Sequence, residues 1–112
     1  MPKPIPNPEQ AIVDERKVHS YLLSPVHTVG RHKAQFFRTL GYDQEGWSRL
    51  QLDLQAFAGA EVRTVIETEF GEKFEVCSTL TGPNGRSADV VTIWLVPGGK
   101  DVARLVTAYP EN

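Results

Sequence analysis

The chain has 112 residues, a formal net charge of −2 at pH 7 and 40% hydrophobic residues, which predicts one soluble globular domain with one hydrophobic core. Its single cysteine, Cys77, excludes an internal disulfide and a cysteine-based zinc cage, and no apolar run approaches the roughly 18 residues that a membrane span requires. The first residues contain no apolar stretch of the signal-peptide kind, so we expect a cytoplasmic protein with no membrane partner.

Prolines occupy alternate positions at the start of the chain, from Pro2 to Pro8. Because proline fixes φ and has no N–H donor, residues 1–10 are predicted to form an extended arm or a disordered tail. The remaining residues, 11–112, are predicted to form a single α+β domain. In this domain about three N-terminal helices pack on one face of a four-stranded antiparallel sheet.

Three segments have apolar residues at helical spacing. The first follows Asp14, a residue type that is common at helix N-caps, and ends before Pro25. The second starts near Gly30 and runs to Leu40. The third follows Asp43, which can cap it. Its apolar stripe comprises Trp47, Leu50, Leu54 and Phe57.

From Val62 onward the period of the apolar residues changes to two, which is typical of β-strands. The residues with this period fall into four runs, and glycine-containing segments separate each run from the next. These segments are turn signals, and the strongest is Gly82-Pro-Asn-Gly85. Because the turns are short, consecutive strands are predicted to pair in an antiparallel arrangement. The four predicted strands cover residues 62–67, 74–78, 90–96 and 102–109.

The charge is distributed unevenly along the chain. Residues 15–40 carry a net charge of +4 and contain all three histidines, whereas residues 41–112 carry −5. A basic, histidine-containing patch on an acidic body favours a specific anionic partner. The alternative interpretation is a solvated helix face whose charge is balanced by carboxylates of the sheet.

The start of the second predicted helix combines Gly30 with three basic residue types, Arg31, His32 and Lys33. Positive side chains are unfavourable there, because the N-terminus of a helix carries a partial positive charge. Free N–H groups at that end bind phosphates and carboxylates, and Gly30 lets an anion approach the backbone closely. One interpretation is therefore an anion site. The other is that the helix starts a few residues later and the side chains point into water.

The last predicted strand offers a second candidate surface. Alternation predicts that Leu105, Thr107 and Tyr109 share one face, and Thr92 and Trp94 have the matching parity on the preceding strand. Such a face could hydrogen-bond a phosphate and stack a base. It could equally be an amphipathic face of the core.

Five sequence segments carry a resemblance to a known family. They are KVHSYLLS at 17–24, HTVGRHKAQFFRTLGY at 27–42, TGPNGR at 81–86, TIW at 92–94 and LVTAYP at 105–110. Together they resemble an uncharacterised bacterial family, a domain of unknown function that occurs in single-domain proteins and at the C-terminal tips of polymorphic toxins. The resemblance covers nearly the whole chain after the proline-rich arm.

The chain is also similar, more weakly, to the barnase/EndoU/colicin D/RelE-like nuclease superfamily. Members place helices before a four-stranded antiparallel sheet, and many use a helical histidine or lysine together with a serine or threonine late in the sheet. The matching positions are His27, Lys33 and Thr107, with Tyr109 close by. This resemblance implies a toxin-like ribonuclease, with RNA as substrate and a neutralising partner protein.

Metal-independent RNA cleavage by 2′-OH transesterification needs a proton acceptor and a group that stabilises the phosphoryl charge. His27 is the first choice of acceptor because it lies just before the predicted helix start, and His32 is the second. Lys33 is predicted to stabilise the phosphoryl oxygens and Thr107 to orient the phosphate. The chemistry calls for no cofactor, and the histidines lack the i, i+4 spacing of a helical zinc site. The predicted substrate-binding residues are Arg31, Trp94 and Tyr109.

The alternative hypothesis is a non-catalytic protein-interaction module of unknown function. Such a module would bind its partner through the same basic patch or through an exposed edge strand. The two hypotheses place different demands on the fold. A ribonuclease needs His27 or His32 to converge with Lys33 and Thr107 in one cleft, whereas an interaction module tolerates their separation.

Overall fold

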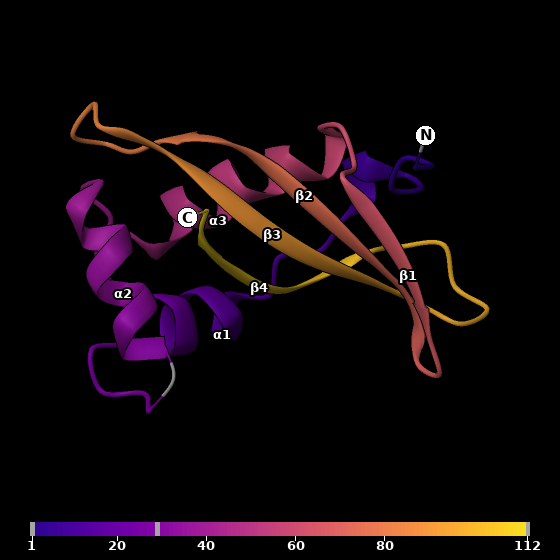
Figure 1. The fold of residues 1–112 in the computed structure, drawn as a ribbon. Helices are drawn as coiled ribbons and strands as arrows, with labels where there is room; N and C mark the ends of the chain where they lie inside the picture. The colour runs from indigo at the N-terminus through magenta and orange to yellow at the C-terminus, as the bar shows by residue number, and fades with distance from the viewer. Residues whose placement is uncertain (1, 29, 112) are drawn as a thin grey trace.

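The computed structural model describes residues 2–28 and 30–111, in which helices precede a four-stranded antiparallel sheet (Figure 1). The predicted α+β class is confirmed. The helical elements are the 3-10 helix η1 (Pro8–Gln10), α1 (Glu15–Lys17), the π-helix η2 (Val18–Leu22), α2 (Gly30–Thr39), α3 (Trp47–Gln55) and the 3-10 helix η3 (Ala56–Gly59). The strands are β1 (Thr64–Thr68), β2 (Gly71–Thr81), β3 (Ser87–Pro97) and β4 (Arg104–Pro110).

The sheet has the strand order β1-β2-β3-β4, and each strand is antiparallel to its neighbour, as predicted. This order follows from the short connections, which let each strand pair with the one that precedes it in the chain. β2 and β3 pair along their full lengths and form the centre of the sheet.

One face of the sheet carries the hydrophobic core. Trp94 of β3 and Phe74 of β2 are cross-strand partners, and both are fully buried. Leu50 and Leu54 of α3 and Phe37 of α2 belong to the same core. In Figure 1, α3 passes behind the sheet, whereas α1 and α2 lie beside β4 and contact it. The prediction that helices pack on one face of the sheet therefore holds for α3. In contrast, α1 and α2 contact β4, which is an edge strand of the sheet.

The proline-rich arm packs against the domain. Ile5 is only 2% exposed and belongs to the core. The Asn7 side chain donates to the carbonyl oxygen of Asp101 at 2.9 Å. Just after the arm, Ile12 forms an isolated parallel bridge with Arg104, at the start of β4. The arm is therefore part of the folded structure and not a disordered tail.

The C-terminus of α2 is closed by a glycine and by the β2–β3 hairpin. Gly41 has a φ of 96°, and the N–H of Tyr42 donates to the carbonyl of Phe37 at 3.2 Å, which is the bond pattern of a Schellman motif. The side chain of Asn84, in the hairpin turn, donates to the carbonyl of Thr39 at 3.0 Å. These bonds fix α2 relative to the sheet and therefore fix the direction of its side chains.

The first predicted helix changes its winding after one turn. In η2 the N–H of Leu23 donates to the carbonyl of Val18 at 2.9 Å, five residues earlier. α2 packs directly on the backbone of this π-helix, because a Cβ atom built on Gly30 would overlap the carbonyl oxygen of Tyr21. This close approach brings the Tyr21 side chain next to α2.

A β-bulge in β4 changes which side chains share a face. Ile93 pairs with Thr107, but the next residue of β3, Trp94, pairs with Leu105, so Val106 is an extra residue in β4. Leu105 consequently faces the core with Trp94, whereas Thr107 faces the opposite side of the sheet with Ile93. The predicted common face of Leu105 and Thr107 is therefore wrong, because simple alternation does not account for the bulge.

Candidate functional site

Lys33, Tyr21 and Thr107 meet where η2, α2 and β4 come together, and we call these three residues the Lys33 cluster. The Nζ of Lys33 donates to Tyr21 Oη at 2.7 Å and to Thr107 Oγ1 at 3.0 Å. Tyr21 Oη and Thr107 Oγ1 are themselves 3.5 Å apart. The fold thus closes a triangle of polar atoms from residues that are as far as 86 positions apart in the chain.

Aromatic rings flank the positive charges at this cluster. The Nζ of Lys33 lies 5.0 Å from the centroid of the Tyr21 ring and 6.0 Å from that of Tyr109. The Nζ of Lys17 lies 5.2 Å from the Tyr21 centroid. Within the described ranges, no carboxylate comes within 4.0 Å of either ammonium group. Hydroxyl groups and π-faces therefore hold these cations, and their charge is not neutralised by an acidic side chain.

The electrostatics of the cluster act on the phenol of Tyr21. Partial burial raises the pKa of this hydroxyl, but its hydrogen bonds with Lys33 and Thr107 lower it. The positive charges of Lys33 and Lys17 lower it further. The lowering effects together outweigh burial, so the pKa of Tyr21 lies below its ordinary value.

His27 is placed at the edge of the cluster by the start of α2. Its Nδ1 accepts a hydrogen bond from the N–H of Gly30 at 3.0 Å, and its carbonyl accepts one from the N–H of Arg31 at 3.0 Å. The His27 ring contacts the Tyr21 ring edge to face, with a centroid distance of 5.0 Å. The predicted helix start at Gly30 is confirmed. His27, however, occupies the N–H groups of Gly30 and Arg31 that the predicted anion site would have used.

The Lys33 cluster lies in an open pocket of about 880 Å³. Among the described residues, Arg16, Lys17, Lys33 and Arg104 line this pocket, and Asp14 is the single carboxylate there. His27, Tyr21 and Thr107 are also part of the wall. The apolar part of the wall consists of Ile12, Leu95, Leu105 and Val106. A pocket of this kind suits a ligand that has negative charge and an apolar or aromatic portion.

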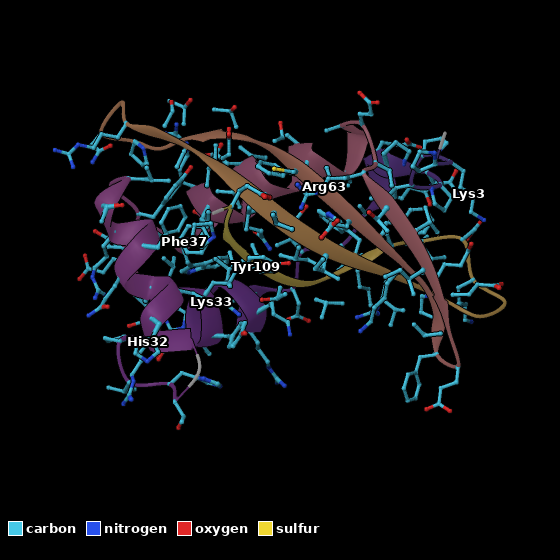
Figure 2. All side chains as sticks on the ribbon, in the orientation of Figure 1. Lys3, His32, Lys33, Phe37, Arg63 and Tyr109 are labelled. Carbon is cyan, nitrogen blue, oxygen red and sulfur yellow. The ribbon has the colours of Figure 1, made fainter. Side chains whose placement is uncertain are left out.

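Three of the predicted catalytic residues, His27, Lys33 and Thr107, line this one pocket. Tyr109 adjoins it through the contact between its ring and the Lys33 ammonium. Figure 2 shows Lys33 and Tyr109 side by side, with His32 farther out on α2. His32 and Arg31 are exposed and do not line the pocket, since successive helix residues point about 100° apart. The structure therefore separates these two residues from the cluster.

The predicted role of Trp94 in base stacking is wrong. Its side chain is 0% exposed in the core, and its indole N–H donates to Thr92 Oγ1 at 2.8 Å. Thr92 is also buried and in turn donates to the carbonyl of Val76 at 3.1 Å. Thr92 and Trp94 therefore form a structural hydrogen-bonded pair within the core and present no surface to a ligand.

Tyr21 is the main site residue that the sequence reasoning missed. Its helical spacing with Val18 and Leu22 placed it in an apolar stripe, whereas its hydroxyl belongs to the Lys33 cluster. Lys17, one helical turn before Tyr21, was a signal in the sequence, because residues i and i+4 share one helix face. No local sequence pattern indicated the contact of Tyr21 with Thr107, because the two residues are 86 positions apart in the chain.

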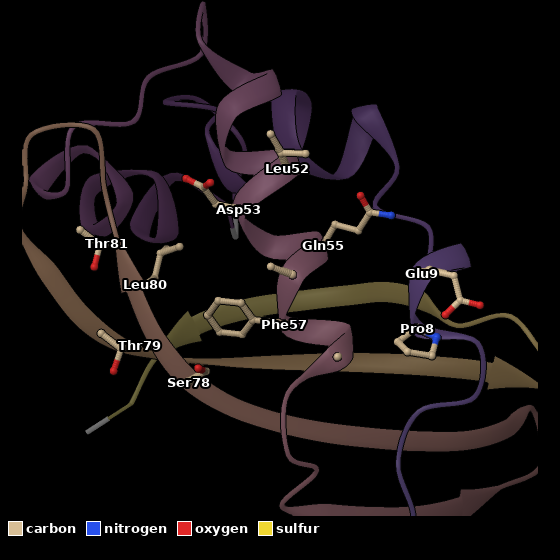
Figure 3. Close-up of a pocket in the computed structure, with 12 residues that line it drawn as sticks. Pro8, Glu9, Leu52, Asp53, Gln55, Phe57, Ser78, Thr79, Leu80 and Thr81 are labelled. Carbon is tan, nitrogen blue, oxygen red and sulfur yellow. The ribbon is translucent and has the colours of Figure 1, made fainter.

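A second pocket, of about 830 Å³, lies between α3, η3 and β2 (Figure 3). Asp53 lines it and accepts a hydrogen bond from the buried Tyr42 hydroxyl at 2.6 Å. Burial and the neighbouring Asp53 carboxylate raise the pKa of Tyr42. No lysine, arginine or histidine lines this pocket within the described residues, so it lacks the positive charge of the Lys33 pocket.

Two further types of site are absent from residues 2–28 and 30–111. No group of three or more histidine, cysteine, aspartate and glutamate side chains is arranged to hold a metal ion in these ranges. No helix in the same part of the chain is long and apolar enough to cross a membrane.

Comparison with known proteins identifies the family and a related fold. A search of curated proteins finds no match. Among solved structures, the fold matches a chain of a "contact-dependent growth inhibition toxin - immunity protein complex" from Klebsiella pneumoniae 342, with a TM-score of 0.72 and 18% sequence identity. The match covers 94% of this chain and 97% of that one. The model of a family described as "Domain of unknown function (DUF6883)" matches residues 4–112, and the chain therefore belongs to that family.

Proposed function

We propose that this protein is a toxin-like, metal-independent ribonuclease that cleaves RNA by attack of a ribose 2′-OH on the adjacent phosphate. The observation that carries the proposal is the Lys33 cluster, in which an ammonium and two hydroxyl groups lie within 3.5 Å of one another in a basic pocket. The reaction needs such groups, because negative charge develops on the phosphoryl oxygens as the new bond forms.

Each member of the cluster suits a separate role at the phosphate. Lys33 supplies a positive charge that no carboxylate of the described residues neutralises. Thr107 Oγ1 accepts from Lys33, so its own hydroxyl hydrogen points either to Tyr21 Oη, 3.5 Å away, or to a phosphate oxygen once one is bound. The proton of the 2′-OH then requires an acceptor in the same pocket, and the pocket offers His27 and Tyr21.

The rest of the pocket suits the rest of an RNA chain. Arg16, Lys17 and Arg104 extend the positive charge beyond the cluster, where neighbouring phosphates would lie. Tyr109 adjoins Lys33 and is only partly buried, so its ring is placed to stack on a base next to the bound phosphate. The negative net charge of the whole chain does not oppose this, because the positive charge is concentrated at the pocket.

The structural neighbour supports the proposal in a more general way. Its complex joins a toxin to an immunity protein, so this fold occurs in a toxin system. At 18% identity the likeness shows the fold alone, and a non-catalytic protein-interaction module could share it. The basic pocket favours the ribonuclease, because a module that only binds a protein does not need an ammonium and two hydroxyl groups to converge.

Growth of a bacterial host under tightly controlled expression tests the proposal. The native protein is expected to arrest growth, and RNA from the arrested cells is expected to be cleaved. A Lys33→Ala/Thr107→Ala double variant should allow growth at the same level of soluble protein. Arg38→Ala replaces an exposed residue of the same helix. This variant serves as the control and should still arrest growth. Unaffected growth with the native protein well expressed would overturn the toxin-like assignment and favour the interaction module.

A further inference from the structure

We infer that Tyr21 takes the proton from the attacking 2′-OH and that Lys33, to which it is hydrogen-bonded, gives a proton to the 5′ oxygen that leaves. This inference rests on the proposed RNA cleavage and deepens it, because it assigns the two proton transfers to a tyrosine–lysine pair. It replaces the histidine that the sequence favoured as the proton acceptor.

The position of the Tyr21 hydroxyl is the first argument. Tyr21 Oη lies 2.7 Å from Lys33 Nζ and 3.5 Å from Thr107 Oγ1, so it faces the same small volume as the two groups that would hold the phosphate. An ammonium group can only donate, and Tyr21 Oη is therefore an acceptor in its bond with Lys33. The phenol oxygen thus lies beside the proposed phosphate position, where it accepts a hydrogen bond from the Lys33 ammonium.

The surroundings of the ring are the second argument. The ammonium groups of Lys33 and Lys17 lie 5.0 and 5.2 Å from the centroid of the Tyr21 ring. Two positive charges at these distances stabilise a phenolate relative to a phenol, which agrees with the lowered pKa of Tyr21. A general base is most effective when its pKa is brought toward the working pH, and the cluster moves Tyr21 in that direction.

The hydrogen bonding of His27 is the third argument. Its Nδ1 accepts from the N–H of Gly30 at 3.0 Å, in the first turn of α2. In the neutral ring the proton is therefore on Nε2, and a nitrogen that carries a proton cannot accept another. Protonation of Nδ1 would break the bond to Gly30 at the start of the helix that carries Lys33. His27 is accordingly a positioning residue, whose ring packs against that of Tyr21.

The proton transfers balance within the pair. The 2′-OH gives its proton to the Tyr21 phenolate while the 2′ oxygen forms a bond to phosphorus. The bond between phosphorus and the 5′ oxygen breaks, and the 5′ oxygen takes a proton from the Lys33 ammonium. The Tyr21 hydroxyl then returns its proton to the Lys33 amine across 2.7 Å, which restores the starting state. The products are a 2′,3′-cyclic phosphate and a 5′-hydroxyl, and no co-reactant is consumed.

Kinetics of a fluorescently labelled single-stranded RNA of mixed sequence test this assignment. Tyr21→Phe keeps the ring and its contacts with both lysines but removes the hydroxyl. We expect kcat to fall by about 100-fold or more, with KM changed little, because a general base contributes about 10²–10⁴-fold. His27→Ala is expected to retain the pH profile of the native enzyme. Replacement of Tyr21 by a fluorinated tyrosine, whose phenol is more acidic, should shift the acidic limb of the kcat profile to lower pH.

Two results would overturn the assignment while leaving RNA cleavage intact. One is a Tyr21→Phe variant within about threefold of the native kcat, since that is far below the contribution of a general base. The other is a His27→Ala variant in which the acidic limb of the profile is lost. Absence of cleavage by the folded native protein would instead remove the proposed function and this inference together.

The titration of Tyr21 gives a readout that does not depend on RNA cleavage. In protein carrying ¹³C-labelled tyrosine, the Tyr21 signal, identified by its absence in Tyr21→Phe, should titrate at lower pH than the signal of a model phenol. Lys33→Met should move this titration to higher pH, because it removes the charge and the hydrogen bond that favour the phenolate. A Tyr21 titration that is unaffected by Lys33→Met would contradict the coupling between the two groups on which the inference depends.

Discussion

Lys33 differs from the other basic residues of α2 in the groups that surround its charge. Arg31 and Arg38 are exposed to solvent, whereas the Lys33 ammonium is held by two hydroxyl groups and two aromatic rings. Lys33 is partly buried and loses part of the surrounding water, which strengthens the interaction of its ammonium with an incoming anion. The specific chemistry of the pocket therefore depends on single atoms of a few residues rather than on the total charge of the patch.

The hydroxyl of Thr107 can be tested with an isosteric substitution. Thr107→Val keeps the shape of the side chain but removes its bond with Lys33. We expect RNA cleavage to fall by about 10- to 100-fold, because a hydrogen bond to a charged group contributes about 1.5–3 kcal/mol. Thr79→Val, on the exposed part of β2, is the matched control and should leave cleavage unchanged. Equal effects of the two substitutions would remove Thr107 from the site.

The lowered pKa of Tyr21 predicts a dependence of stability on alkaline pH. Between that pKa and the ordinary value of 10.0, the unfolded chain retains a proton that the folded chain has lost at this site. The stability contributed by the Tyr21 phenol is therefore fully present above pH 10 and is lost as the pH falls through the lowered pKa. Urea unfolding of the native protein and of Tyr21→Phe across this window should show a difference in unfolding free energy that increases with pH.

Tyr42 provides a control for this titration, because its pKa is shifted in the opposite direction. The pKa of Tyr42 is raised by burial and by Asp53, so its phenol contributes stability that decreases as the pH rises above the unfolded value. The difference between the native protein and Tyr42→Phe should therefore fall as the pH rises above 10.0, whereas the difference for Tyr21→Phe rises below that pH. Slopes of the same sign for the two variants, each in its own window, would contradict the opposite environments of the two hydroxyl groups.

At the scale of elements, the close contact of α2 with η2 is what positions Tyr21 beside Lys33. α1 begins as predicted, since Asp14 Oδ1 accepts from the N–H of Arg16 at 2.8 Å and so caps the helix. The following π-helix widens the turn, and Gly30 lets α2 lie directly on its backbone. Widened helical turns of this type are frequent at functional sites, where they alter the direction of a side chain.

A methyl group at position 30 tests this contact. Gly30→Ala would place its Cβ against the carbonyl oxygen of Tyr21, a backbone atom that cannot rotate away. We expect a loss of about 1–3 kcal/mol in unfolding free energy, which is the usual cost of overpacking, together with a loss of cleavage. Gly59→Ala is the control, because no atom from a more distant part of the described chain lies within 4 Å of the added group. Chemical denaturation of both variants measures the difference, and equal stabilities would contradict the described contact.

The limits of the sequence prediction are also visible at the level of elements. The Asp14 cap, the turn glycines and the periods are local signals, and they placed the helices near their observed starts and the four strands in antiparallel order. The predicted cap Asp43 is not the N-cap of α3, which is Gly46, because Asp43 instead accepts from the N–H of Gly46 in the preceding turn. The bulge at Val106 is not a local signal, since it depends on the pairing of β4 with β3. Because the prediction did not include this bulge, it placed Leu105 on the same face as Thr107 and gave Trp94 an exposed position. Lys33 was singled out by the charge at the helix start and Thr107 by strand alternation, and the resemblance gave both a role, whereas Tyr21 required the packing of η2 against α2.

At the scale of the whole molecule, the N-terminal arm stabilises the fold that holds the site together. Ile5 is part of the core, and the segment that follows bridges to the start of β4 through Ile12 and Arg104. Arg104 also lines the Lys33 pocket, so the arm, β4 and the pocket form one connected unit. A composition rich in proline indicated an extended conformation, but only the tertiary structure shows what the arm packs against.

Truncation of Ile5 tests whether the arm contributes to stability. Ile5→Ala should lower the unfolding free energy by about 2–5 kcal/mol, the usual cost of removing a buried isoleucine side chain. Ile66→Ala, at a position that is 56% exposed on β1, is the matched control and should change it by less than about 0.5 kcal/mol. Urea denaturation provides both values. A loss for Ile5→Ala no larger than that for Ile66→Ala would show that the arm does not stabilise the domain.

Cleavage of one defined RNA by the purified protein is the most direct measurement. With a single-stranded RNA of mixed sequence in the presence of EDTA, the native protein should yield fragments with 2′,3′-cyclic phosphate and 5′-hydroxyl ends, identifiable by mass. An RNA fully methylated at its 2′-oxygens should remain intact. Lys33→Met should cleave about 100-fold more slowly, because charge stabilisation at the phosphoryl group is lost, while Arg38→Met should retain activity. Absence of cleavage by the folded native protein, or equal cleavage by Lys33→Met, would contradict a ribonuclease site at Lys33.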